Sequence, residues 1–133
     1  MIAYNKEAID KVSSAILGDA SALQELLKGS HPELAAVASY FANHDEEAFA
    51  WLMKNRLPLL AAFAKAADGD KKAFTFLMKS GNHLLAATAN ASSGDKKARQ
   101  WLEMHGYSHY ALLAQNIEAI RKKRDSDFTG LLH

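Results

Sequence analysis

Residues 69–89 read GDKKAFTFLMKSGNHLLAATA, and residues 94–114 read GDKKARQWLEMHGYSHYALLA. Both blocks carry leucine at the seventh position after the aspartate, and alanine at the third, sixteenth and nineteenth positions. Two earlier blocks, 18–38 and 44–64, keep the same leucine and alanine positions. The repeated aspartates lie 26, 25 and 25 residues apart, at Asp19, Asp45, Asp70 and Asp95. A regular period of this length indicates an architecture of stacked repeats.

Each block predicts two short helices. The aspartate is a good N-cap because its carboxylate accepts hydrogen bonds from the amides of the first turn. Apolar residues follow at the third and seventh positions of every block and at the fourth and eighth positions of the first three, and these positions lie on one helix face. The first helix is expected to end in a left-handed turn at Gly29, Gly81 or Gly106. The second helix is expected to end at Gly18, Gly69 or Gly94, immediately before the aspartate of the next block.

The composition fits an all-helical protein. The 133 residues include 25 Ala and 17 Leu but only 2 Val, 5 Ile and 3 Thr. Alanine and leucine favour helices, whereas β-branched residues favour strands. The absence of cysteine excludes disulfides and thiolate chemistry. No apolar run approaches the roughly 20 residues that cross a bilayer, so we expect a cytoplasmic protein without a membrane partner.

Helices of about ten residues cannot bury their apolar faces alone, but stacked helix pairs can. We therefore predict an all-α fold: a right-handed α–α superhelix, or solenoid, of about four 25-residue helix pairs. One domain is expected to span 1–124, with a half repeat in 1–18 and repeats from 19, 45, 70 and 95. The last helix is expected to end near Lys123. By composition the tail 125–133 is expected to be disordered, unless Phe128, Leu131 and Leu132 dock or a neighbouring molecule packs the tail.

Parts of the repeat resemble known families. The segments LPLLAAFAKAADGDKKAFTFLMKSG (57–81) and HLLAATANASSGDKKARQWLEMHG (83–106) resemble the helical part of ankyrin repeats. The GDxxAxxxL element is similar to Sel1-type and other short tetratricopeptide-like repeats. The ankyrin TPLH tetrapeptide and its hairpin segment are missing here, and the repeat unit is shorter. The resemblance covers roughly 18–114 and implies a helical-repeat interaction scaffold, but it supplies no binding residues.

The polar residues do not form a pattern typical of an active site. His105 and His109 are four residues apart, and His83 lies one repeat earlier, but Gly106 and the turn between the helices separate His105 from His109, so these two do not share a helix face. Adjacent acidic residues stand at helix starts, where the helix dipole favours them. We expect no catalytic residue, no metal and no cofactor.

A scaffold of this kind is expected to bind another protein or a peptide. The residues at positions thirteen and twenty differ in chemistry from block to block, although they stand near the repeated alanines. Such variation is typical of an exposed surface that does not take part in helix stacking. We expect this surface on the concave side, formed by the second helices. Its candidate residues are Pro58, His83, Ser39, Lys65, Asn90 and Gln115. Aromatic residues at position six of the first helices, expected to stack as a ladder, are either core or a second candidate surface: Trp51, Phe76 and Trp101.

The C-terminal end suggests an alternative function. Residues 95–124 contain seven basic and three acidic residues, a net charge of +4. Such a face could hold nucleic acid through phosphate contacts, although solvated helix starts and a soluble tail explain the same charges. The residues of this basic patch are Lys96, Lys97, Arg121, Lys122, Lys123 and Arg124. The sequence identifies neither the partner nor the oligomeric state.

Overall fold

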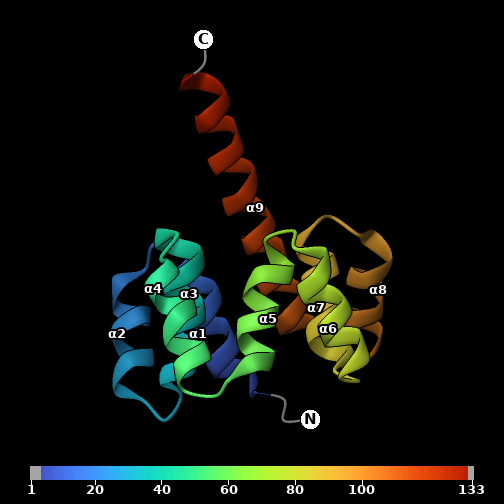
Figure 1. Ribbon diagram of the computed structural model, residues 1–133, viewed down its shortest axis with the longest axis horizontal. Helices are drawn as coiled ribbons and strands as arrows, with labels where there is room; N and C mark the ends of the chain where they lie inside the picture. The colour runs from blue at the N-terminus through green and yellow to red at the C-terminus, as the bar shows by residue number, and fades with distance from the viewer. Residues whose placement is uncertain (1–3, 132–133) are drawn as a thin grey trace.

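The computed structural model describes residues 4–131, with side chains described from Tyr4 to Ser126. Every regular element in this part of the chain is an α-helix (Figure 1), which confirms the all-α prediction. None of the described helices has the length and apolar character of a membrane span. In chain order the helices are α1 (Lys6–Ile16), α2 (Ala20–Lys28), α3 (Pro32–Asn43), α4 (Glu46–Lys54), α5 (Pro58–Ala67), α6 (Lys71–Lys79), α7 (His83–Ser92), α8 (Lys96–Met104) and α9 (Ser108–Leu131).

The repeated aspartates begin helices, as predicted. The Asp70 carboxylate accepts hydrogen bonds from the backbone amides of Lys72 at 2.9 Å and Ala73 at 3.1 Å. The same N-cap contact is made by Asp19, Asp45 and Asp95. Each satisfies amides that a helix start leaves without an intrahelical partner.

Two cap substitutions should therefore have matching effects. Asp70→Ala and Asp95→Ala are each expected to lower the free energy of unfolding by about 1 kcal/mol, because both carboxylates cap the N-terminus of a helix in successive repeats. Urea denaturation of the two variants measures the loss. Unchanged stability in either variant would contradict the cap assignment.

The helices form an inner and an outer layer. Helices α1, α3, α5, α7 and α9 pack each on the next, and α9 also packs on α1, so the inner row closes on itself. Each of α2, α4, α6 and α8 covers two consecutive inner helices. The Tyr4 amide donates to the Tyr110 hydroxyl at 3.0 Å, which joins the two ends of the repeat array. An open superhelix would keep its first and last repeats apart, whereas here they are neighbours.

The centre of the inner layer is filled with side chains. It leaves a void of only about 20 Å³, lined by apolar residues of all five inner helices. The predicted concave surface is therefore wrong, because that side of the second helices is the protein core. The lining residues are Ile9, Val12, Leu34, Val37, Leu60, Phe63, Leu85, Tyr110 and Leu113, with Tyr4 at the edge.

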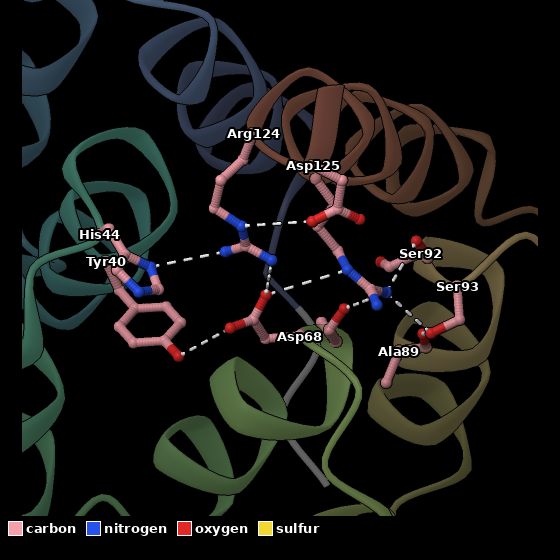
Figure 2. A network of polar contacts seen from close by, with 10 residues as sticks. Tyr40, His44, Asp68, Ala89, Ser92, Ser93, Arg124 and Asp125 are labelled. Atoms are coloured by element: carbon pink, nitrogen blue, oxygen red, sulfur yellow. Dashed lines mark hydrogen bonds and ion pairs between the residues drawn. The ribbon is translucent and has the colours of Figure 1, made fainter. Parts of the chain in front are cut away.

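A polar network ties α9 to the carboxyl ends of α3, α5 and α7 (Figure 2). Asp68, directly after α5, accepts hydrogen bonds from Arg124 Nη2 at 2.9 Å and from the Tyr40 hydroxyl at 3.2 Å. Arg121 Nη1 donates to the Ala67 carbonyl at 2.9 Å. A cation at a helix C-terminus satisfies free carbonyls and opposes the negative end of the helix dipole. The two arginines therefore help to hold α9 in place.

The last helix is longer than expected. α9 runs to Leu131 rather than ending near Lys123, and its last turns project beyond the body of the protein (Figure 1). Residues 124–129 contain neither proline nor glycine, so nothing interrupts helical hydrogen bonding. The prediction of a disordered tail is therefore wrong for 125–131. The predicted docking through Phe128, Leu131 and Leu132 concerns side chains outside the described part.

The left-handed turns between the helices of a pair occur at the eleventh position after the repeated aspartate, whether or not that residue is glycine. Gly81 and Gly106 have φ of 75° and 80°, as predicted. Gly29 has φ of −87°, so its predicted left-handed turn is wrong, because it stands one position earlier in its repeat. Arg56 occupies the position of Gly81 and Gly106 and has φ of 59°. A side chain larger than Asn in this conformation is unusual and costs roughly 1–2 kcal/mol.

Burial of Tyr40 predicts a loss of stability at high pH. Burial, and next the Asp68 carboxylate, raise the pKa of the Tyr40 phenol above its usual 10.0. Since folding favours the neutral phenol, its contribution is present below pH 10 and is lost as the pH rises further. Unfolding by urea at about pH 8 and about pH 11 should show this loss, and Tyr40→Phe should reduce it. An equal loss in Tyr40→Phe would contradict this role.

Candidate functional site

A groove lies between the outer helices α6 and α8, with the inner helix α7 as its floor. The three helices lie together on one side of the molecule (Figure 1). The groove has a volume of about 500 Å³, within the usual range for binding pockets. Its walls are Phe74 and Met78 of α6 and Asp95, Lys97, Ala98 and Trp101 of α8, and its floor is His83, Ala86, Ala87 and Asn90.

The repeat explains this combination of apolar walls and a shallow floor. Ala86 stands at one of the repeated alanine positions at which second helices pack, and Ala87 beside it is also small. Met78, at position eight of its block, is 44% exposed, while Phe74 and Trp101 are half-buried. An apolar surface left open above a floor of methyl groups can receive side chains from a partner.

The equivalent groove of the preceding repeat is filled by Lys65. Its Nζ lies 2.9 Å from Glu46 Oε2 and 4.4 Å from the centre of the Phe49 ring. Asn90 replaces this lysine in the α6–α8 groove, and Lys71 replaces the glutamate. No long side chain can therefore bridge the floor and the wall in the same way. Lys65 thus lies over the Phe49 ring in the preceding groove, whereas no lysine stands at the corresponding floor position of the α6–α8 groove.

Of the lysines in the first turns of α6 and α8, Lys97 lines the groove at one end. Lys71 and Lys72 stand in the first turn of α6, and Lys96 and Lys97 stand in the first turn of α8. All four lysines are exposed. The Asp95 carboxylate, which also lines the groove, accepts hydrogen bonds from the Lys97 and Ala98 amides. This rim complements an acidic segment.

The structure brings together only part of the predicted binding strip. His83 and Asn90 line the groove with Trp101. Of the remaining predicted residues, Lys65 fills the neighbouring groove, Ser39 Oγ donates to Asp45 at 3.2 Å, Gln115 is exposed on α9, and Pro58 borders a different cavity. His83 and Asn90 lie between the outer helices α6 and α8, whereas Pro58 and Gln115 are not part of this groove.

The predicted aromatic ladder is not formed. Trp51 and Phe76 are 38% and 42% exposed, and among the described side chains no ring contact joins them to each other or to Trp101. The Trp101 ring instead stacks on His105, with centroids 4.4 Å apart. Each outer helix packs mainly on inner helices, which separates the position-six rings.

The predicted basic patch is divided by ion pairs. Arg121 and Arg124 are used in the network around Asp68. Glu118 lies 3.7 Å from Lys122 Nζ and 3.4 Å from Arg99 Nη2. The remaining members of the patch, all exposed, are Lys96, Lys97 and Lys123.

Sequence reasoning misses three features of the molecule. The periodicity of the sequence places Phe74 and Met78 on the apolar face of their helix but does not show that they line a groove. The signal that could have found the groove is the alignment of the repeats, in which Asn90 replaces Lys65. Arg56 carries no motif, although the repeat alignment places it where two other repeats have glycine. Asp68 reads as one of the acidic residues at a helix start, whereas it follows the end of α5.

No known family model, curated protein or solved structure matches this chain. The resemblance to ankyrin and tetratricopeptide-like repeats stays an expectation from the sequence. What the chain binds is therefore inferred from the contacts and charges of the described residues.

Proposed function

We propose that this protein is a non-catalytic helical-repeat scaffold whose α6–α8 groove binds an amphipathic helix of a partner protein. The observation that supports this proposal best is the open groove itself. Its exposed apolar walls stand on a floor of small residues, and the neighbouring groove is filled by Lys65. A helix bound there would lie on α7 between α6 and α8, in the manner of a helix-in-groove complex.

The chemistry of the groove defines the partner helix. Apolar side chains at i, i+3, i+4 and i+7 would contact Met78, Trp101 and the alanine floor. Acidic residues at one end would meet the lysines in the first turns of α6 and α8. The expected partner segment is therefore apolar on one face and acidic at one end.

Selection from a library of helical peptides tests the groove directly, because it assumes nothing about the sequence of the partner. We expect selected peptides to carry this apolar spacing with acidic residues and to bind one per chain. The Ala87→Glu variant should bind these peptides at least about tenfold more weakly, because the glutamate places a charge on the apolar floor of the groove. The matched variant Ala62→Glu, at the same position of the preceding repeat, should bind like the wild type. Both positions are partly exposed, so little stability should be lost.

Two outcomes would overturn the proposal. Equal binding by Ala87→Glu and wild type would place the peptide elsewhere, with Trp51 and Phe76 on the outer face as the next candidates. Binding of generic nucleic acid at micromolar concentration, with a steep salt dependence, would favour the alternative function. In that case replacement of Lys96, Lys97, Lys122 and Lys123 by Gln should remove the binding.

A further inference from the structure

A second cavity opens at the end of the molecule where the inner helices begin. It has a volume of about 400 Å³ and lies between the starts of α5, α7 and α9. Its walls are mainly aliphatic, with two tyrosine rings at one side. The lining residues are Leu57, Pro58, Leu59, Leu60, Leu84, Leu85, Tyr4, Tyr110, Arg56 and Asn82. Except for Pro58, none of these residues is part of the candidate sites described above.

Hydrogen-bond donors gather in this apolar cavity. Asn82 is only 6% exposed, and its Oδ1 accepts from the Leu85 amide at 3.2 Å. Its Nδ2 donates to none of the groups that the structure describes. The start of α5 has no side-chain cap, so no side chain accepts from the amides of its first turn. Free donors at a helix N-terminus and on the Asn82 amide favour an anion.

Arg56 adds a full positive charge to the lining. Among residues 4–126 its side chain makes no ion pair or hydrogen bond. Its backbone has φ of 59°, where the equivalent residues of the next two repeats are Gly81 and Gly106. Glycine would adopt this turn without strain, so stability does not account for arginine here. Strain of this kind is found at binding sites, where the side chain has another use.

We propose that this cavity binds an aliphatic monocarboxylate, with its chain among the leucines and its carboxylate on Arg56 and Asn82. The apolar walls favour a hydrocarbon chain, and the cavity volume is within the range of small-ligand sites. A carboxylate accepts hydrogen bonds only, which matches a guanidinium, an amide Nδ2 and the α5 amides. The site does not depend on the α6–α8 groove.

Decanoate is the probe for this site, and calorimetry of the full chain is the measurement. We expect one decanoate per chain, with a dissociation constant on the order of 100 µM. Decanol has the same chain without the charge, and decylammonium has the opposite charge. Each of these probes should bind at least about tenfold more weakly than decanoate.

Two variants separate binding from folding. Arg56→Gly should raise the unfolding temperature, because glycine adopts the left-handed backbone conformation without strain. The same variant should bind decanoate at least about tenfold more weakly. Asn82→Asp keeps the cap oxygen for the Leu85 amide but replaces the donor by a carboxylate. It should remain folded and repel decanoate. Lys79→Ala, an exposed cation at the end of α6, is the control and should bind like the wild type.

Three results would overturn the proposal. One is the absence of saturable one-to-one binding by decanoate. Another is equal affinity for decanol, which would show an apolar cavity without a carboxylate site. The third is unchanged decanoate affinity in folded Arg56→Gly and Asn82→Asp. None of these results bears on peptide binding to the α6–α8 groove, so the two proposals can fail separately.

Discussion

Replacing Phe63 by alanine is expected to lower the free energy of unfolding by about 4 kcal/mol. The Phe63 side chain is 2% exposed and lies where all five inner helices meet. Its ring centroid is 6.3 Å from that of Phe41, in an edge-to-face arrangement. Removing the ring leaves a large cavity, because helices that are held on both sides by neighbours cannot collapse into the space.

Phe49→Ala is the matched control for this loss. Phe49 stands on the outer helix α4 and is only half-buried, so its removal should cost about 1–2 kcal/mol. Urea denaturation of both variants gives the comparison. Similar losses in the two variants would contradict a central core shared by the five inner helices.

Replacing Asp68 by alanine is expected to lower the free energy of unfolding by about 3 kcal/mol. The change removes the carboxylate that Arg121 and Arg124 share, leaves Arg124 only the more distant Asp125 carboxylate, and removes the acceptor of the Tyr40 hydroxyl. The Arg121 and Arg124 side chains are 23% and 40% exposed, so water compensates the two arginines in part. The loss is therefore at the lower end of that observed when one partner of a buried ion pair is removed.

Asp70→Ala is the control for this change, because it removes a carboxylate two residues away that acts only as an N-cap. Its loss should be about 1 kcal/mol. Hydrogen exchange adds a local measurement. In Asp68→Ala, we expect faster exchange of α9 amides near Ile117 and Ile120 relative to Asp70→Ala. Equal stability losses with unchanged exchange in α9 would contradict the role of the network in holding that helix.

The repeat and its helix boundaries could be predicted because they depend on neighbours in sequence. Asp70 and Asp95 bond amides two and three residues away, and Gly81 and Gly106 turn the backbone locally. Closure of the inner layer depends instead on contacts between the two ends of the chain. The Tyr4 amide and the Tyr110 hydroxyl are 106 residues apart in sequence. The period of the repeat contains no information about such a contact, because it is the same in an open and a closed array.

The candidate groove could be predicted only in part. Repeat alignment found His83 and Asn90 as positions free to vary, and the structure places both on the groove floor. The alignment could not show that Lys65 folds back over Phe49, since that depends on side-chain conformation and on Glu46 across the groove. The difference between a filled and an open groove is therefore a tertiary property.

The central functional claim concerns this open groove, and amide chemical-shift mapping with a selected acidic amphipathic peptide tests it most directly. We predict that the peptide perturbs amides of α6, α7 and α8, with the largest changes near Met78, Ala87 and Trp101. In the double variant Asn90→Lys/Lys71→Glu, which restores the lysine and glutamate of the preceding repeat, a lysine over the Phe74 wall should imitate the filled groove and abolish these changes at the same peptide concentration. Perturbations centred on α4 and α5, or an unchanged map in the folded double variant Asn90→Lys/Lys71→Glu, would contradict the claim.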